Sequence, residues 1–370
     1  MNYSVISADN HIIEPRDLFV SRMPRAFRDR APRVAPGADG GDGWSWKGEV
    51  PSRTFGIEAV AGQGAGYKAS GLRWEEILPG NYDGAAHLAD MDKDGVDAAV
   101  VFPQVTINAY AEPDRPFALA VLGTYNDWLL DDFQKVDPKR LVGLCMLPVN
   151  DGMDTAVAEM DRCLAKGARG FFIPGIPKRP YFDPYYEPLW KAASAAGVPL
   201  CLHRTFGGTT TDAIFRHDQP GVNVAGIVIR FFSAVDHFTY LIYSGVFERN
   251  PGLKVVDAEV NCGWVEFWKA MLDLNWEQQK HWARFPFSHR PSDALGRNLF
   301  VSVLNDEVGF AAMQRDPQIA SMSMYSIDYP HSVTLWPNSK KYIAELTQGL
   351  DPKLKRDVLA GNAARVFGLA

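Results

Sequence analysis

The chain has 370 residues, of which 46% are hydrophobic and 22% charged. This balance is that of an ordinary globular protein and excludes a largely disordered or fibrous chain. The 38 Lys and Arg residues and the 44 Asp and Glu residues leave a net charge of −6. Such mild acidity gives no general attraction to nucleic acid or to an anionic membrane, so neither is expected as a partner.

The N-terminus lacks the basic region and apolar run of a signal peptide. Charged or polar residues are expected to interrupt every apolar stretch before it could span a bilayer. The cysteines are widely spaced and form no CxxC pair; they are Cys145, Cys163, Cys201 and Cys262. This spacing excludes a zinc ribbon and argues against a disulfide framework. Cys145, Cys201 and Cys262 lie in or beside apolar segments and are expected to be buried thiols. We therefore expect a cytoplasmic, reduced protein.

Short apolar runs, rich in Val, Ile, Leu and Phe, recur along the chain with helix-like segments between them. The predicted strands cover residues 3–8, 97–102, 141–147, 169–173, 198–203, 254–259, 299–304 and 323–328, and the helical segments include 155–165, 188–196, 231–247 and 265–274. Most runs lack polar alternation, as do strands that are covered on both faces. The repeated alternation of strand and helix predicts an α/β fold, a (β/α)8 or TIM barrel, in a single domain over residues 1–370.

The region between the first two predicted strands breaks this rhythm. Residues 20–90 are interpreted as a long insertion and loop region after the first strand, and the glycine-rich part at 36–71 is expected to hold a small hairpin and flexible loops. Loops this long in a compact domain are usually functional or disordered. A second irregular stretch is expected at 205–226.

Polar residues that close the predicted strands are the candidates for chemistry, because the active site of such a barrel forms at the carboxyl ends of its strands. The first strand ends with Asp9 and His11, two residues apart and so on one face. The fifth ends with His203, the sixth with Glu259 and the eighth with Asp328.

Two histidines and two carboxylates, namely Asp9, His11, His203 and Asp328, suit one divalent cation, with Zn²⁺ first and Mn or Fe as alternatives. A bound divalent ion can lower the pKa of its water to about 7 and polarise a carbonyl. A carboxylate beside the ion, Asp328 or Glu259, can then move a proton. Each motif alone also fits a structural role, as a core histidine or a turn-forming aspartate. The prediction rests on their joint placement.

Four segments give the chain a family resemblance: residues 6–15 (ISADNHIIEP), 245–256 (GVFERNPGLKVV), 328–331 (DYPH) with 336–337 (WP), and 361–369 (GNAARVFGL). The chain resembles the amidohydrolase superfamily, in particular its amidohydrolase-2 branch, and is similar to aminocarboxymuconate-semialdehyde decarboxylase and γ-resorcylate decarboxylase. The resemblance implies that Asp9, His11 and His203 stand at ligand positions, and that Asp328 binds metal and moves a proton.

The chain departs from the family pattern at two positions. Its first-strand pair is D-x-H, where the family has H-x-H or E-x-H. Glu259 stands where the decarboxylases generally carry a histidine that helps to activate water or to position substrate. Glu259 could act there as a base, become another ligand, or be structural.

Other residues have two interpretations each. Arg204 could clamp a substrate carboxylate bidentately or pair with a structural aspartate. His331 could bond to the substrate or support a ligand. Glu14 could support His11 from behind or cap the following segment, and His237 could reach the substrate only if its helix leans over the barrel mouth. The histidines expected on the surface are His87, His217, His281 and His289.

The leading interpretation is a metal-dependent hydrolase, acting through metal-activated water on a small aromatic or cyclic substrate that bears a carboxylate. Nonoxidative decarboxylation of a similar substrate is the close alternative, and a noncatalytic barrel that binds a small molecule is a further one. The family resemblance and the long insertion, which could cross an interface, favour a homodimer.

Overall fold

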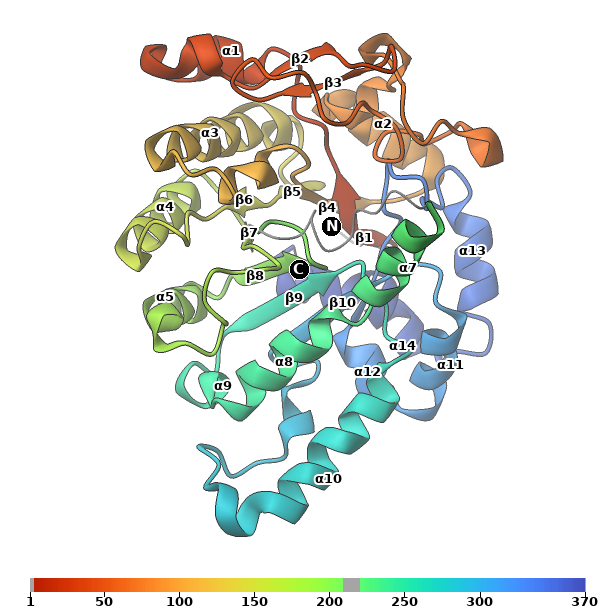
Figure 1. Cartoon of the computed structure of the whole chain (residues 1–370). Coiled ribbons are helices and arrows are strands. Elements are labelled where there is room, and N and C mark those ends of the chain that lie inside the picture. Colours follow the sequence, from red (N-terminus) through yellow and green to blue (C-terminus); the bar gives the residue numbers. More distant parts are fainter. Residues whose placement is uncertain (1–2, 209–219, 370) are drawn as a thin grey trace.

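A computed structural model describes residues 3–208 and 220–369 of the chain. Its central sheet consists of short parallel strands (Figure 1). These are β1 (Ile6–His11), β4 (Ala98–Phe102), β5 (Leu141–Gly143), β6 (Cys145–Met146), β7 (Phe171–Phe172), β8 (Pro199–His203), β9 (Lys254–Ala258), β10 (Leu299–Val303) and β11 (Ser323–Tyr325). The strands are buried almost throughout, which explains why most of them are rich in apolar residues and lack polar alternation.

The strands close into a barrel through two seams. β5 and β6 are separated by Leu144 alone and so form one barrel strand, the one predicted at 141–147. At the other seam, Asp328 donates its backbone N–H to Asp9 O at 3.0 Å, and His11 donates to Tyr329 O at 2.6 Å. Nine strand segments thus make eight barrel strands, and the predicted (β/α)8 barrel is confirmed.

Helices surround the barrel on its outside (Figure 1). They are α1 (Leu18–Arg22), α2 (Gly84–Asp94), α3 (Arg115–Trp128), α4 (Met153–Ala165), α5 (Glu187–Ala196), α7 (Pro220–Arg230), α8 (Ser233–Tyr243), α9 (Val246–Arg249), α10 (Val265–Ala283), α11 (Glu307–Arg315), α12 (Pro317–Met322), α13 (Ser339–Leu346), α14 (Pro352–Arg356) and α15 (Asn362–Val366). Gly197, at φ 69°, ends α5 directly before β8, as the sequence pattern predicts.

The segment between β1 and β4 contains α1, an antiparallel hairpin of β2 (Arg33–Pro36) and β3 (Asp42–Ser45), and α2. Its glycines allow backbone segments to approach closely: a Cβ on Gly41 would lie 2.6 Å from Gly71 Cα. Two hydrogen bonds fasten the segment to the loop after β11, from Ala61 N to Pro330 O and from Ser332 N to Ile57 O. The assignment of one domain with an insertion over 20–90 stays a prediction.

The structure differs from the sequence prediction in two places. Part of the stretch expected to be irregular at 205–226 belongs to α7, and the helix expected at 231–247 is divided into α8 and α9 by Gly245, which has a φ of 73°. The prediction that every apolar stretch is interrupted before it could span a bilayer is wrong for Val224–Tyr243, across α7 and α8. By length and composition alone this stretch could cross a membrane, with a mean hydropathy of 1.3, and 28% of it is buried in the fold.

Candidate metal centre and active site

Four side chains from three barrel strands meet at the carboxyl ends of the strands. Asp9 and His11 lie on β1, His203 ends β8, and Asp328 follows β11; all four are buried. The Nε2 atoms of His11 and His203 are 2.9 Å apart. Asp9 Oδ1 lies 3.4 Å from both of these nitrogens, and Asp328 Oδ1 lies 3.4 Å from His11 Nε2. The structure therefore brings together the four residues that the sequence groups as metal ligands.

These four residues fit a divalent cation. Within the described residues, neither Asp9 Oδ1 nor Asp328 Oδ2 has a hydrogen-bond partner, although both atoms are buried. Buried polar atoms without partners are rare and require an explanation. One proton shared between the Nε2 atoms of His11 and His203 would still leave both carboxylate oxygens unpaired. A cation held by these side chains would give the unpaired oxygens a partner, and carboxylate and imidazole are suitable donors for Zn²⁺ or Mn²⁺.

The path of β1 explains how two of these residues reach the site. Three residue steps along β1, from Ser7 to Asn10, oppose two steps along β4, which is a β-bulge. At the bulge, Ser7 Oγ donates to Asn10 Oδ1 at 2.7 Å, and Asn10 Nδ2 donates to His87 Nε2 at 3.0 Å. Asn10 is thereby held by His87, while its neighbours Asp9 and His11 face the other candidate ligands.

His87 is buried and does not lie on the surface, contrary to the sequence prediction. Because its Nε2 accepts a hydrogen bond from Asn10, the proton of the neutral ring sits on Nδ1, which donates to Gly80 O at 2.8 Å. Burial lowers the pKa of the imidazole to about 4. His281 is exposed and His289 is half-buried. His217 lies outside the described residues.

The pKa values of the two candidate carboxylate ligands are shifted in opposite directions. Burial, and then the charge of Asp9, raise the pKa of Asp328 well above its usual value. Burial would also raise the pKa of Asp9, but the imidazoles of His203 and His11 more than offset this and hold it below its usual value. The pKa values of the two carboxyl groups are therefore shifted in opposite directions, which favours the negative charge on Asp9 and the proton on Asp328.

Ser302 contacts the candidate ligand Asp9 and was not singled out from the sequence. This buried serine on β10 donates its hydroxyl to Asp9 Oδ2 at 3.2 Å and accepts the backbone N–H of Glu259 at 2.7 Å. It occupies one oxygen of Asp9 and leaves Oδ1 toward the two imidazoles. A single polar residue in the apolar strand sequence LFVSV was the available signal.

Arg204 and Glu259 form a buried ion pair at the edge of the site. Arg204 Nη2 lies 2.5 Å from Glu259 Oε1, and Arg204 Nε donates to the Glu259 carbonyl at 2.5 Å. The guanidinium also lies 4.3 Å from the centre of the Phe231 ring. Glu259 Oε2 is 3.7 Å from His203 Nε2, and burial together with the charge of Asp328 raises the pKa of Glu259 to about 7. Glu259 thus borders the candidate ligands, but its carboxylate is already engaged with Arg204.

Backbone strain collects at the same strand ends. The non-glycine residues in the left-handed region here are Arg204 (φ 47°), Glu259 (φ 57°), Asn261 (φ 56°) and Asp328 (φ 50°). Each such residue costs on the order of 1 kcal/mol or more, and such strain clusters at functional sites. Three of these four residues were singled out from the sequence for other reasons, so the strain is an independent sign that the barrel mouth is functional.

His331 lies closer to the candidate ligands than expected. Its Nδ1 is 3.0 Å from Asp328 Oδ1, and its ring stacks on that of His11 with centroids 3.9 Å apart. His11, Asp328 and His331 each offer one possible ligand atom, and these three atoms lie within 4.8 Å of one another. His331 is therefore also a possible metal ligand. Its Nε2 is 3.3 Å from Gln104 Oε1.

Two predicted site residues have structural contacts instead. The Glu14 carboxylate accepts hydrogen bonds from Val105 N at 3.0 Å and from Thr106 N at 2.9 Å, so it caps the turn after β4 and has no described contact with His11. His237 Nε2 donates to Gly175 O at 2.8 Å, which ties α8 to the loop after β7. The prediction that Glu14 supports His11 and the prediction that His237 binds substrate therefore find no contact among the described residues.

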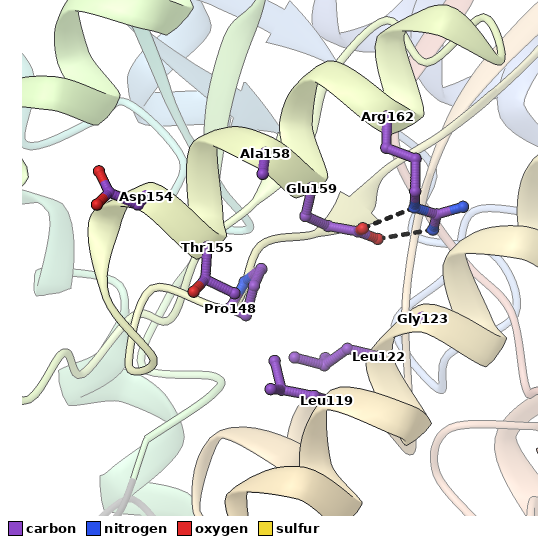
Figure 2. A pocket seen from close by; sticks show the side chains of 9 residues that line it. All are labelled: Leu119, Leu122, Gly123, Pro148, Asp154, Thr155, Ala158, Glu159 and Arg162. Atoms are coloured by element: carbon purple, nitrogen blue, oxygen red, sulfur yellow. Dashed lines mark hydrogen bonds and ion pairs between the residues drawn. The ribbon is translucent and has the colours of Figure 1, made fainter. Parts of the chain in front are cut away.

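A surface groove of about 570 Å³ lies on the outside of the barrel, between α3 and α4 (Figure 2). It is lined by Leu119, Leu122, Gly123, Pro148, Asp154, Thr155, Ala158, Glu159 and Arg162. Its main charged pair is satisfied internally, because Arg162 Nε donates to Glu159 Oε2 at 2.7 Å. None of the candidate site residues lines this groove, so it is separate from the barrel mouth.

Comparisons with known proteins agree with the fold. The chain is 26% identical to the γ-resorcylate decarboxylase of Rhodococcus jostii (strain RHA1) over 269 residues, which are 67% of this chain and 77% of that protein. It is similar to the crystal structure of an amidohydrolase from Mycobacterium avium subsp. paratuberculosis K-10, with a TM-score of 0.79, 22% identity and full coverage of both chains. It is also similar to a dihydroxybenzoic acid decarboxylase from Polaromonas sp. JS666 with bound manganese and 2-nitroresorcinol, with a TM-score of 0.66, 16% identity, and coverage of 100% of this chain and 98% of that one.

The model of one protein family matches most of the chain. It covers residues 80–369 and so includes His203, Glu259 and Asp328, while Asp9 and His11 precede it. The chain therefore belongs to the Amidohydro_2 family, described as amidohydrolase.

Proposed function

We propose that the chain is a metal-dependent nonoxidative decarboxylase of an aromatic acid that carries a hydroxyl group beside its carboxylate. The observation that carries this proposal is the cluster of buried side chains that could hold a metal ion, Asp9, His11 and His203 with Asp328 beside His11, in an Amidohydro_2 barrel. The similarity to γ-resorcylate decarboxylase supports decarboxylation over hydrolysis, which the sequence analysis placed first. The Glu259 carboxylate, which had favoured hydrolysis, pairs with Arg204 and is not a free base.

The cation would be held by Asp9, His11, His203 and Asp328. When bound, a divalent cation supplies a Lewis acid that attracts the substrate's carboxylate and neighbouring hydroxyl oxygen and offsets negative charge there. Zinc was the expectation from the ligand types, and the manganese in the similar dihydroxybenzoic acid decarboxylase makes Mn²⁺ an equal candidate.

Asp328 is the proposed proton donor. It donates its proton to the ring carbon that bears the carboxylate; the bond between that carbon and the carboxylate then breaks, its electron pair returns to the ring, and CO₂ leaves. Asp328 is left as a carboxylate and must regain a proton before the next cycle. The 3.0 Å distance from His331 Nδ1 to Asp328 Oδ1 supports His331 as the group that would relay it.

The test is an assay of the metal-loaded enzyme with 2,6-dihydroxybenzoate and related hydroxybenzoates. We expect one CO₂ released for each ring product, and loss of turnover by at least about a thousandfold in Asp328→Asn, which retains the shape of the side chain without an equivalent proton to donate. His281→Ala, a change at an exposed histidine of α10, serves as the matched control and should leave turnover unchanged.

Other outcomes would decide against decarboxylation. A product that has gained water, without CO₂, would favour the hydrolase. Tight ligand binding with no turnover at any metal loading, unaffected by Asp328→Asn, would favour a noncatalytic binding barrel.

A further inference from the structure

The imidazole ring of His331 has contacts on two edges and on one face. Its Nδ1 lies 3.0 Å from Asp328 Oδ1, and its Nε2 lies 3.3 Å from Gln104 Oε1. One face stacks on the His11 ring with an interplanar angle of 23°. The stack fixes the plane of the ring but not which edge points at Asp328. A half-turn about the Cβ–Cγ bond leaves the ring in the same plane and puts a carbon in the place of Nδ1.

Gln104 selects one of these two orientations. Its amide oxygen can only accept a hydrogen bond, so the proton of a neutral His331 ring lies on Nε2, and Nδ1 presents a lone pair. In the other orientation a C–H group would face the amide oxygen, and this hydrogen bond would be lost. The contact with Gln104 therefore keeps Nδ1 directed at Asp328.

A buried carboxylate fixes the turn that presents Gln104. Gln104 follows β4, and the next two residues donate their backbone N–H groups to Glu14, Val105 to Oε2 at 3.0 Å and Thr106 to Oε1 at 2.9 Å. The Thr106 hydroxyl also donates to Glu14 Oε1, at 2.5 Å. Glu14 is fully buried, and a buried carboxylate is costly unless hydrogen bonds compensate it. These three bonds hold the backbone directly after Gln104.

We propose that Gln104 is a positioning residue that keeps His331 directed at Asp328, and that Glu14 acts by holding Gln104 in place. This inference rests on the proposed function, in which His331 returns a proton to Asp328 after each cycle. In that step Nδ1 gives its proton to the Asp328 carboxylate and takes the next one from water, while the Nε2–H bond to Gln104 stays intact. Glu14 thereby serves the site although it has no described contact with His11.

The order of the steps gives this role a kinetic signature. The proton returns to Asp328 only after CO₂ has left, so a poorly held His331 does not slow the first cycle. It slows every later cycle. The value of kcat should therefore fall, whereas kcat/KM, which reports the steps up to the first irreversible one, should hardly change.

The first test compares Gln104→Met with Gln104→Glu in the metal-loaded enzyme. A positioned acid or base typically contributes about 10²- to 10⁴-fold, so Gln104→Met, which has no acceptor for Nε2–H, should lower kcat by about ten- to hundredfold. Its kcat/KM should change by less than about threefold, and rapid mixing should show a burst of about one CO₂ per chain. Gln104→Glu keeps an acceptor oxygen and should retain kcat within about threefold of the wild type.

Gln318→Met is the matched control. Gln318 is half-buried on α12, which precedes β11, whereas the site lies beyond the other end of that strand. Its Nε2 donates to Ser292 O at 2.6 Å, so this variant also loses a side-chain hydrogen bond. It should have the kinetics of the wild type. Unchanged kcat in Gln104→Met, or an equal fall of kcat and kcat/KM, would overturn the proposal.

A double variant tests the step through Glu14. Glu14→Gln loses one acceptor for the turn, and it should lower kcat by about threefold or more with little change in kcat/KM. If Glu14 acts through Gln104 alone, adding Glu14→Gln to Gln104→Met should lower kcat no further. Circular dichroism melting verifies that each variant folds. Two effects on kcat that multiply would overturn the link between Glu14 and Gln104.

NMR of the zinc-loaded protein tests the orientation of His331 without any turnover. In protein with ¹⁵N-labelled histidine, the ring signals of His331 are those missing from His331→Gln. We expect a proton on Nε2 in the wild type and a mixture of both tautomers in Gln104→Met. A wild-type Nε2 without a proton would overturn the proposal even if the enzyme releases CO₂. The expected pattern would support the orientation even if the enzyme catalyses another reaction.

Metal affinity tests the alternative that His331 is itself a ligand. Residues that orient a ligand typically contribute about 10- to 100-fold to metal affinity. If His331 serves the relay, Gln104→Met should change the affinity for Zn²⁺ by less than about threefold in competition with a chelating dye. A loss of about tenfold or more would make His331 a ligand that Gln104 supports, and would overturn the relay.

Discussion

The Nε2 atoms of His11 and His203 face each other at 2.9 Å inside the barrel, with Asp9 Oδ1 at 3.4 Å from each. A proton or a cation must lie between two nitrogens this close, and burial holds the pKa of His11 well below its usual value. A shared proton leaves Asp9 Oδ1 without a partner, whereas a cation between the nitrogens would also bind that oxygen. The site should therefore depend on its cation for stability as well as for chemistry.

The first prediction concerns removal of the metal. The metal-loaded protein should contain about one divalent ion per chain, measurable by elemental analysis. With the free cation at a hundred times its Kd, binding contributes about 2.7 kcal/mol to the free energy of unfolding. For a chain of this length that difference raises Tm by about 3 °C, which chelation should reverse in a calorimetric scan.

The variant His203→Ala removes one donor of the candidate metal centre. It should weaken metal binding by at least about a hundredfold and abolish the metal-dependent part of Tm. His281→Ala, at an exposed position of α10, should bind metal as the wild type does. Stoichiometric metal of unchanged affinity in His203→Ala would contradict the proposed ligand set.

The second prediction concerns Ser302, which orients Asp9 through the hydrogen bond to Oδ2. Residues that support a ligand in this way typically contribute 10- to 100-fold to metal affinity, so Ser302→Ala should weaken binding by about that factor. The variant should also lower the free energy of unfolding by about 1–2 kcal/mol, because the backbone N–H of Glu259 loses its buried acceptor.

Ser323→Ala is the matched control for Ser302→Ala. Ser323 is also a buried serine on a barrel strand, but its hydroxyl donates to Ile319 O at 2.8 Å. It should cost a similar free energy of unfolding and leave metal affinity, measured by competition with a chelating dye, unchanged. If both variants lose affinity equally, Ser302 acts through general stability alone.

Much of this arrangement could be predicted from the sequence, because strand ends and polar residues are local signals. The runs that end in His203 and Asp328 are visible as apolar stretches with a polar residue at the close, and barrel topology then brings them together. The pair Asp9 and His11 was visible for the same reason.

Contacts that depend on packing between distant segments were not predictable. His87 lies in a sequence that reads as an exposed helix face, and only the bulge in β1 supplies the Asn10 amide that buries it. Glu14 follows the ligand motif closely, yet its acceptors are filled by Val105 and Thr106, which come from a loop about ninety residues away. Which of several partners a polar side chain meets is decided by tertiary structure.

The third prediction separates a structural from a chemical role for Glu259. Removing one partner of a buried ion pair typically costs about 3–5 kcal/mol, because the other charge is left unpaired. Arg204→Met and Glu259→Gln should each destabilise the metal-free protein in urea unfolding by about 3 kcal/mol. The loss in the free energy of unfolding in the double variant should be smaller, by about 2 kcal/mol, than the sum of the losses in the two single variants.

An additive double variant would contradict the ion pair as the main role of Glu259. Metal affinity gives an independent measurement. If Glu259 serves only Arg204, Glu259→Gln should change metal affinity by less than about threefold, whereas a Glu259 ligand would lower it much more.

The last prediction concerns pH and His87, whose pKa is lowered to about 4 by burial. An unfolded histidine has a pKa of about 6.5, so the unfolded chain takes up a proton here at a higher pH than the folded chain does. The stability that neutral His87 contributes is therefore complete above pH 6.5 and is lost as the pH falls from 6.5 through 4. The loss amounts to about 2 kcal/mol by pH 5 and about 3 kcal/mol below pH 4.

His87→Gln retains an acceptor for Asn10 and a donor for Gly80 but cannot be protonated. The free energy of unfolding of the metal-free proteins should therefore be measured in urea at pH 7.5, 6 and 5. Between pH 7.5 and pH 5, the wild type should lose about 2 kcal/mol relative to the variant. The other buried histidines affect both proteins equally, so the difference isolates His87. His281→Gln, at an exposed position, should follow the wild type at every pH. If the difference in the free energy of unfolding between wild type and His87→Gln stays constant with pH, His87 has the same pKa in the folded and unfolded chains. Its Nε2 would then not be held as the neutral acceptor of the Asn10 hydrogen bond.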